Sequence, residues 1–316
     1  MGSFLDTLAF SFSITGPIFV VLALGVLLSR RGMINDNFVD IGSRLVFNIT
    51  LPSLLFISIS QTSIEQAANF KLIGVGLVGT LIAYLLLELI ASRRVYPSTE
   101  RGVVVQGGFR SNMGIIGLAY CVNAYGDQGL VSASLYLALV TILFNILSVI
   151  TLSRSLNRGA GVRATLLGIA KNPLILGILL ALPVAWLGIE LPQLVIRTGE
   201  YFAHMTLPLA LICTGASLNF GALRHNLSNA MLAATFKLIA VPALITFGGF
   251  LLDFRGLELG ILFLMASAPT AAASYVMVRS MGGNASLAAN IIVMTTLGSL
   301  LTTSIGVTLL KSLALI

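Results

Sequence analysis

The sequence predicts an all-α integral membrane protein whose ten transmembrane helices form two inverted five-helix repeats. Three observations support this fold class: the composition, ten apolar segments of membrane-spanning length, and an internal match at a constant offset. Charged residues make up 9 % of the chain, compared with about 25 % in globular proteins, and the mean hydropathy is +1.01. So few charges cannot cover a water-exposed surface, so lipid must surround most of the chain. This composition excludes a soluble enzyme, a nucleic-acid-binding protein and a disordered scaffold.

Ten segments are long and apolar enough to cross the hydrocarbon core, which takes about 20 residues of helix. We number them spans one to ten: 8–29, 38–60, 70–92, 103–123, 130–152, 167–188, 194–219, 228–251, 257–279 and 287–310. The connections are short, and the longest polar stretch, Ser153 to Arg163, is a linker rather than a domain.

The basic residues indicate the orientation of the chain rather than a nucleic-acid surface, despite the net charge of +7. Eleven Lys and Arg residues lie on the side reached after odd-numbered spans, and four lie on the other side. The first group is Arg30, Arg31, Arg93, Arg94, Arg101, Arg154, Arg158, Arg163, Lys171, Arg224 and Arg279; the second is Lys71, Arg197, Arg255 and Lys311. Because cytoplasmic loops are enriched in Lys and Arg, both termini are expected outside. The first span lacks a basic n-region and a cleavage site, so we expect it to be retained.

No metal site or cofactor is predicted. Cys121 and Cys213 lie in apolar stretches and are expected to be buried small residues rather than a disulfide. His204 and His225 share no metal-ligand spacing with Cys, Asp or Glu. Residues 74–79 match the dinucleotide-binding pattern G-x-G-x-x-G, but they lie inside span three with no preceding strand, which favours close helix packing.

Matching residues recur at an offset of 156 in the two halves, residues 1–156 and 157–316. Pro17 corresponds to Pro173, Gly32 to Gly188, Gly126 to Gly282, and Thr50-Leu51-Pro52 to Thr206-Leu207-Pro208. Each half holds five spans, an odd number, so the second half enters the membrane from the opposite side. Inverted repeats of this kind are a transporter architecture, with the binding site near mid-membrane at broken helices.

Spans four and nine are predicted to be broken. Residues 107–114 are too polar and too rich in glycine for an uninterrupted helix, and their counterparts in span nine include Pro269. Ser111 or Asn112 is expected to cap the second half of span four, and Ser267 precedes Pro269 at the expected first turn of the second half of span nine. Two half-helix N-termini would then meet near mid-membrane, an arrangement that favours an anion.

On these residues the chain resembles the auxin efflux carrier family, in particular its short bacterial members, over essentially its full length. The matching motifs are Leu51-Pro52, Asn112-Met113-Gly114, Ala268-Pro269-Thr270-Ala271-Ala272 and Gly282-Gly283-Asn284. The resemblance implies the bile-acid-symporter-like fold, with a scaffold of spans one, two, six and seven. Spans three to five and eight to ten would form a moving core in which spans four and nine cross.

The resemblance also implies transport of organic anions such as indole-3-acetate or malonate, dimers formed through the scaffold, and a place in the bacterial cytoplasmic (inner) membrane. Arg110 departs from the small residues expected beside Asn112, and this departure favours a negatively charged substrate.

Arg110 is the strongest single candidate for substrate binding, because a guanidinium inside a span is costly unless it is paired or faces water. We expect it to bind a carboxylate with both nitrogens; the alternative is that it reaches the cytoplasmic interface or ties down the broken backbone. Asn145 is expected to reach the crossing, with an interhelical hydrogen bond as its alternative. The residues predicted to line the site are Arg110, Ser111, Asn112, Met113, Asn145, Ser267, Pro269, Thr270, Ser274 and Tyr275.

Four further residues have structural interpretations. Pro52 and Pro208 predict kinks in scaffold spans rather than ligand contacts. Lys237 and Glu88 are assigned to the cytoplasmic ends of their spans, from which long side chains reach the interface.

Together these features predict a secondary transporter for a small organic anion, a mono- or dicarboxylate, with elevator-type movement of the core against the scaffold. The expected partners are that anion, the lipid bilayer and, as the resemblance implies, a second copy of the chain, but not nucleic acid. The crossing segments contain no Asp or Glu, so coupling to sodium or protons stays open, as do the substrate and the direction of transport. The alternatives are a sodium-coupled bile-acid-type symporter and a channel; an intramembrane enzyme would need a nucleophile–base pair or a metal cluster.

Overall fold

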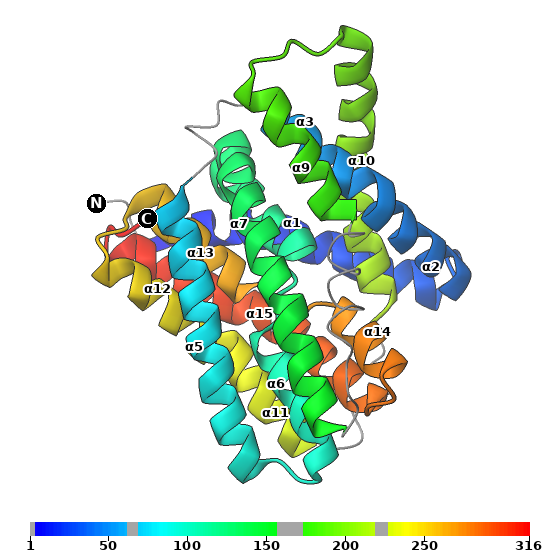
Figure 1. Ribbon diagram of the computed structural model, residues 1–316, viewed down its shortest axis with the longest axis vertical. Coiled ribbons are helices and arrows are strands. Elements are labelled where there is room, and N and C mark those ends of the chain that lie inside the picture. Colours follow the sequence, from blue (N-terminus) through cyan, green and yellow to red (C-terminus); the bar gives the residue numbers. More distant parts are fainter. Residues whose placement is uncertain (1–3, 62–68, 157–172, 219–226) are drawn as a thin grey trace.

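The computed structural model describes residues 4–61, 69–156, 173–218 and 227–316, and these residues are helical throughout apart from turns and two breaks (Figure 1). Within them the structure contains no β-strand, only an isolated bridge between Ser111 and Thr270. The start of predicted span six and the end of span seven lie outside the described residues. So do His225 and four of the basic residues used for orientation: Arg158, Arg163, Lys171 and Arg224.

The first half begins with α1 (Phe4–Arg30) and a continuous helix made of α2 (Asp36–Leu45), a π-helical turn (Val46–Thr50) and α3 (Leu51–Ser60). After α5 (Phe70–Arg94), a 3-10 turn (Ser98–Glu100) leads into α6 (Arg101–Phe109). Beyond the first break come a second π-helical turn (Met113–Gly117) and α7 (Leu118–Ser155). Gly126 bends α7, because its φ of 57° and ψ of −140° are not helical.

The second half contains α9 (Pro173–Trp186) and α10 (Gln193–Ala216), followed by a continuous helix of α11 (Leu227–Thr235), a π-helical turn (Phe236–Ala240) and α12 (Val241–Leu251). The second break separates α13 (Gly256–Ser267) from α14 (Ala273–Ser280), and α15 (Ala285–Ser312) ends the chain.

Six helical segments of the described chain are long and apolar enough to cross a membrane. They are Ser13–Arg30, Asp36–Ser60, Phe70–Arg94, Met113–Ser155, Leu227–Leu251 and Ala285–Ser312. Two shorter apolar helices, Leu176–Trp186 and Gly256–Ser267, accompany them. The all-helical architecture and these segments are those of an integral membrane protein.

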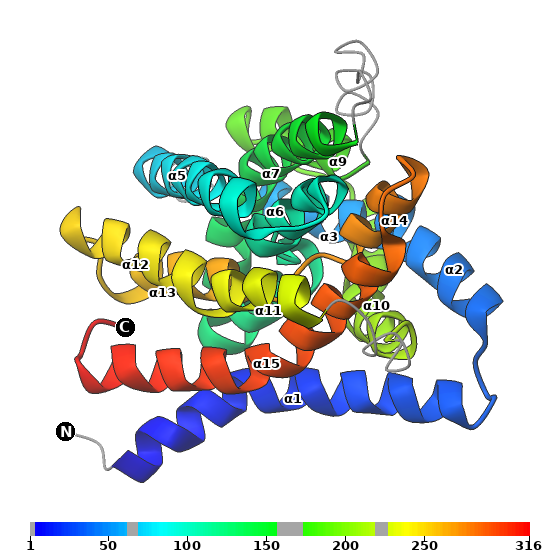
Figure 2. The ribbon, with the colours of Figure 1, turned by 90° about the horizontal axis from the view of Figure 1, so that it is seen from below.

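The helices pack in two groups. The peripheral group contains α1, α2, α3, α9 and α10, and the crossing group contains α5, α6, α7 and α11 to α15. Figure 1 shows α3, α9 and α10 together at the upper right, and Figure 2 shows α1 lying along α15. The groups meet where α1 packs on α15 and α7, and where α3 and α9 pack on α7.

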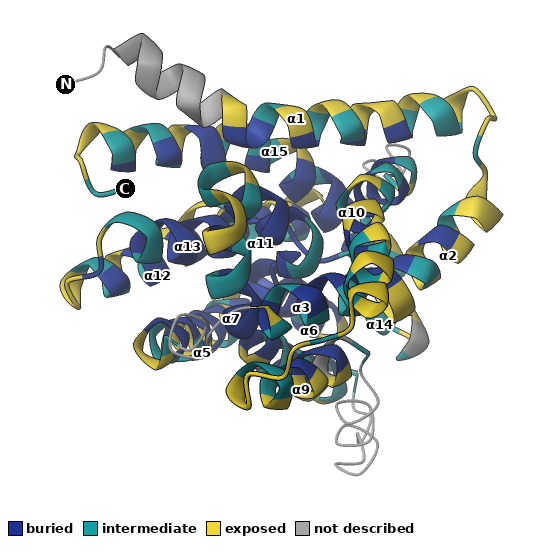
Figure 3. Ribbon diagram, turned by 90° about the horizontal axis from the view of Figure 1, so that it is seen from above, coloured by how far each residue is buried: buried dark blue, intermediate teal, exposed yellow. Residues whose placement is uncertain are grey.

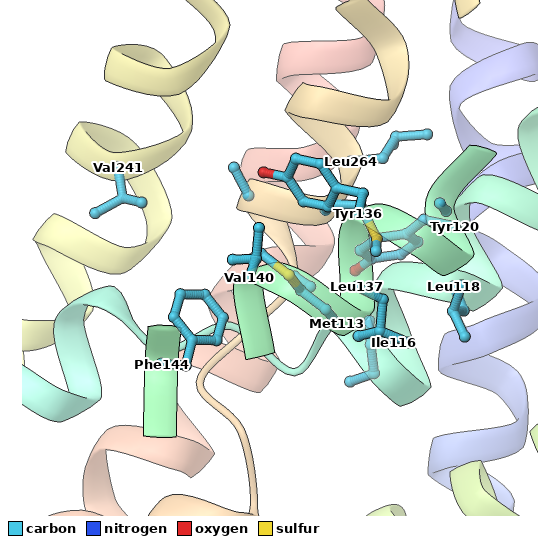
Figure 4. Close-up of a cluster of buried hydrophobic side chains, with 14 of the residues drawn as sticks. Met113, Ile116, Leu118, Tyr120, Tyr136, Leu137, Val140, Phe144, Val241 and Leu264 are labelled. Carbon is cyan, nitrogen blue, oxygen red and sulfur yellow. The ribbon is translucent and has the colours of Figure 1, made fainter. Parts of the chain in front are cut away.

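Apolar side chains fill the crossing group and also cover the outside of the molecule. Tyr136, Val140 and Phe144 of α7 lie among buried residues of several helices (Figure 4). Figure 3 shows exposed residues along the outer faces of α1 and α2 and buried residues between the helices. Exposed apolar side chains such as Val20 and Leu301 are expected where lipid is the solvent. Cys121 and Cys213 are free and buried, as predicted.

Carboxylate–amide contacts lie at the starts of α6 and α13. Glu100, just before α6, is buried and accepts hydrogen bonds from Asn229 Nδ2 of α11 at 2.6 Å and from Asn284 Nδ2 at 2.8 Å. Glu258, in the first turn of α13, accepts a hydrogen bond from the side chain of Asn69, the N-cap of α5. In each contact, a glutamate at the start of a broken helix accepts a hydrogen bond from an asparagine side chain. The asparagine lies at the start of a helix in the other half of the chain.

Glycines that correspond between the two halves share an unusual backbone conformation. Gly32 and Gly188 have φ of 69° and 60°, and Gly126 and Gly282 have φ of 57° and 75°. Residues with a Cβ rarely adopt such angles, which explains why glycine occupies each position.

Candidate functional site

The two broken helices cross at their breaks, where their backbones form an antiparallel bridge. The N–H of Asn112 donates to the carbonyl of Pro269 at 2.7 Å, and the N–H of Ala271 donates to the carbonyl of Arg110 at 3.0 Å. Inside a membrane, water does not satisfy backbone groups released from a helix, so these bonds stabilise the breaks.

Two hydroxyl groups form further hydrogen bonds between the two broken helices. Ser111 Oγ donates to the carbonyl of Ala266 in the last turn of α13, at 3.3 Å, and Thr270 Oγ1 donates to the carbonyl of Gly107 in the last turn of α6, at 2.6 Å. Each half-helix therefore receives a C-terminal cap from the other broken segment. Thr270 is also held by α15, because its N–H donates to Thr295 Oγ1 at 3.1 Å.

The guanidinium of Arg110 lies beside this crossing, with only 8 % of the residue exposed. Nη2 donates to Asn145 Oδ1 at 2.8 Å, and Nη1 lies 3.3 Å from Ser148 Oγ and 3.5 Å from Met277 Sδ. All three partners are neutral, and no carboxylate of the described chain forms an ion pair with Arg110. The structure thus brings Arg110 and Asn145 together, and the part of the chain that it describes supplies no counter-charge to the guanidinium.

Buried polar atoms next to Arg110 have unmet hydrogen-bonding capacity. Gln106 Nε2 donates to Met277 Sδ at 3.1 Å, but Gln106 Oε1 has no hydrogen-bond partner in the described part of the chain. Ser274 Oγ, one turn before Met277, is buried and equally without a partner there. Since most buried polar groups are hydrogen-bonded, these atoms indicate a place for a polar ligand or water.

The expected capping at the second break is wrong in detail. Pro269 does not begin a helix: it lies in the extended segment, and α14 begins only at Ala273, because the Pro269 carbonyl and the Ala271 N–H are used by the bridge. Ser267 is the last residue of α13, and its hydroxyl donates to the carbonyl of Leu264 at 3.1 Å.

At the first break, Asn112 occupies the N-cap position before Met113, as expected. Its carbonyl accepts from the N–H groups of Ile116 and Gly117, at 3.1 and 3.0 Å. Its side chain, however, makes no capping hydrogen bond. Met113 packs among apolar side chains (Figure 4), and Tyr275 is half-buried on α14.

Pro52 and Pro208 lie inside continuous helices of the peripheral group. Pro52 follows the π-helical turn in the helix 36–60, and α9 packs so closely on it that a Cβ on Gly177 would lie 2.9 Å from the Pro52 carbonyl oxygen. Pro208 lies inside α10. A cavity of about 430 Å³ also lies in this group, lined by Ser60, Gln61, Ile189, Glu190, Leu191 and Ile196, but none of the crossing residues lines it.

Sequence reasoning missed four residues near the crossing: Gln106, Ser148, Met277 and Lys237. Ser148 was discoverable, because it follows Asn145 by three residues and shares its helix face. The assignment of Lys237 to a cytoplasmic end is wrong: the side chain is fully buried, and Nζ donates to the Ala266 carbonyl at 2.5 Å. Glu88 is half-buried, accepts a hydrogen bond from Thr151 and lies 3.8 Å from Arg154.

Comparison with known proteins identifies a family of membrane transport proteins. The family described as "Membrane transport protein" matches residues 14–307. A protein of Methanothermobacter thermautotrophicus named "Uncharacterized transporter" is 28 % identical over 90 % of this chain and 93 % of its own length. "Uncharacterized transporter YfdV" of Escherichia coli K12 is 25 % identical over 87 % and 91 %.

A third relative, from Rhizobium meliloti, is named "Putative malonate transporter" and is 26 % identical over 95 % of both chains. These relatives are all named as transporters. The match over residues 14–307 establishes that the chain belongs to the membrane transport protein family, the auxin efflux carrier family, and is a transporter rather than an enzyme.

Proposed function

We propose that this protein is a secondary transporter for a small organic anion and that Arg110 binds a carboxylate of the substrate. The observation that carries the proposal is the buried guanidinium beside the crossing, surrounded by neutral partners. A buried charge without a counter-charge is costly, and a carboxylate both compensates it and matches the fork of guanidinium nitrogens.

The surroundings of Arg110 are suited to the same ligand. Helices begin at Met113 and Ala273, directly beyond the bridged segments, and the positive ends of their dipoles favour an anion. Ser274 Oγ offers an additional hydrogen bond. The relative named for malonate fits the same chemical class.

We further propose ten spans in two inverted repeats. The corresponding positive-φ glycines support this arrangement, as do the two glutamate–asparagine contacts. Glu100 and Glu258 both precede a break, and their partners Asn229 and Asn69 both begin the third span of a half. The start of α1 and the end of α15 lie at the same side of the molecule (Figure 2), which suits an even number of spans.

Alternating access would come from movement of the crossing group against the peripheral group. The division of the helix contacts into these two groups supports this mechanism. Both termini would lie outside the cytoplasmic membrane, as the basic residues indicate, and the peripheral group would form the homodimer contact.

The test is a thermal-shift screen of the detergent-purified protein against monocarboxylates, dicarboxylates, indole-3-acetate and bile acids, with and without sodium. A ligand that binds only the folded state raises its stability by RT ln(1 + [L]/Kd). We expect one class of carboxylate to raise the Tm of the wild type and not that of Arg110→Ala. Arg197→Ala, an exposed arginine of the peripheral group, is the matched control and should respond like the wild type.

Equal stabilisation of Arg110→Ala would exclude Arg110 as the ligand. The absence of any shift with organic anions would contradict the anion proposal itself. A shift that requires sodium would favour the sodium-coupled symporter instead.

A further inference from the structure

Lys237 is a buried cation that the proposed mechanism does not yet use. It lies in the π-helical turn between α11 and α12, with no exposed surface, and its Nζ donates to the carbonyl of Ala266 at 2.5 Å. Among the described residues no carboxylate lies within ion-pair distance of it.

The contact places this ammonium at the crossing. The carbonyl of Ala266 accepts hydrogen bonds from both Lys237 Nζ and Ser111 Oγ, and Ser111 directly follows Arg110 in the chain. Two buried cations, Arg110 and Lys237, therefore belong to one junction of spans four, eight and nine.

The nearby helix ends do not balance these charges. Two half-helices end at the crossing, at Phe109 and Ser267, and two helices begin beyond it, at Met113 and Ala273. Each helix end carries only about half a unit charge, so the negative ends of α6 and α13 do not neutralise both Arg110 and a protonated Lys237.

Charged side chains on the helices packed against the π-helical turn do not balance them either. These helices are α6, α11, α12, α13 and α15. Their charged groups are Arg101 at the start of α6, Glu258 in the first turn of α13 and Lys311 in the last turn of α15. The carboxylate among them, Glu258, is two helical turns from Ala266 and is bound by Asn69.

We propose that Lys237 determines specificity, making the site select dianions such as short dicarboxylates over monoanions. This inference rests on the proposed function. One substrate carboxylate binds Arg110, and the field of Lys237 favours the second negative charge without direct contact. At a separation of about 10 Å and an effective permittivity of about 20, attraction between the Lys237 ammonium and the second carboxylate would change the affinity for the substrate by roughly tenfold.

The experiment measures Kd by isothermal titration calorimetry on the purified full-length protein at constant ionic strength. The ligands are malonate, succinate and glutarate, each paired with its monomethyl ester, which keeps the skeleton and removes one charge. For the wild type we expect the best diacid to bind roughly tenfold more tightly than its ester. In Lys237→Met the ratio should fall toward one, and in Lys237→Arg it should be retained.

Lys71→Met, which removes an exposed lysine of α5, is the matched control and should keep the wild-type ratio. A purely structural role of Lys237 would weaken both ligands of a pair equally, and an unchanged ratio in Lys237→Met would overturn the proposal. A wild-type ratio near one overturns it without any variant, so the test holds even if Lys237→Met does not fold. Failure of the wild type to bind any of these anions would instead contradict the proposed function.

Discussion

At the scale of single residues, the position of Arg110 depends on one face of α7. Asn145 Oδ1 accepts a hydrogen bond from the guanidinium at 2.8 Å, and Ser148, one turn later, offers its hydroxyl at 3.3 Å. A buried donor that carries charge loses more than a neutral one when its acceptor is removed. Asn145 therefore has a structural role whether or not it also contacts substrate.

We expect Asn145→Ala to lower the free energy of unfolding by about 1–3 kcal/mol, because the guanidinium loses its closest acceptor in a buried place. Denaturation of the purified protein in mixed micelles measures the change. Asn48→Ala is the control: Asn48 is exposed, and its amide only donates to the Arg44 carbonyl of its own helix. Equal effects of the two substitutions would mean that the Arg110 contact adds nothing to stability.

The contacts that join distant parts of the chain at this site could not be predicted from the sequence. Arg110 meets Met277 across 167 positions of the chain, and Lys237 meets Ala266 across 29. Lipid and the protein interior are equally apolar, so a membrane-spanning helix is apolar on every side. Its sequence therefore has no separate polar and apolar faces that would indicate which face points inward. Asn145 was found because a single amide within an apolar span must point inward.

At the scale of elements, the sequence located the breaks better than their ends. Glycine and polar residues marked the first break, which the structure places at residues 110–112. At the second break Pro269 was assigned to a helix start, but the helix resumes at Ala273 because pairing between the two segments uses the intervening backbone. Local capping rules do not include such a distant partner.

Glycine has a conformational role at the bend of α7, and this leads to a prediction. Gly126 has a φ of 57° and a ψ of −140°, and no atom lies within 4 Å of the Cβ that Ala would add, so strain alone opposes the substitution. We expect Gly126→Ala to lower the free energy of unfolding by about 1–3 kcal/mol. The same micelle denaturation measures it.

Gly74→Ala tests the explanation. Gly74 also has open space around its Cβ position, but it lies inside α5 with no positive φ, so Ala should leave stability unchanged or raise it by up to about 1 kcal/mol. If Gly126→Ala were as harmless as Gly74→Ala, the bend would not require glycine.

At the scale of the whole molecule, two groups of helices meet over surfaces that are largely apolar. Hydrogen bonds between described residues cross the boundary at α1: Thr15 Oγ1 and Ser304 Oγ lie 3.0 Å apart, and Asn123 Nδ2 donates to the Ile14 carbonyl at 2.9 Å. Movement of the crossing group against α1 would have to break both. The boundary is therefore the place to test the proposed mechanism.

A disulfide across this boundary should stop transport, whereas one within the peripheral group should not. Thr15→Cys with Ser304→Cys joins α1 to α15 at positions whose side chains already touch. Gly42→Cys should pair with the native Cys213, because a Cβ at Gly42 would lie 2.7 Å from Cys213 Sγ, and both residues belong to the peripheral group. In proteoliposomes we expect oxidation to abolish anion counterflow only in the Thr15–Ser304 pair, and reduction to restore it. Full counterflow by the oxidised Thr15–Ser304 pair would show that the groups need not move at α1, because a covalent bond does not yield as a hydrogen bond does.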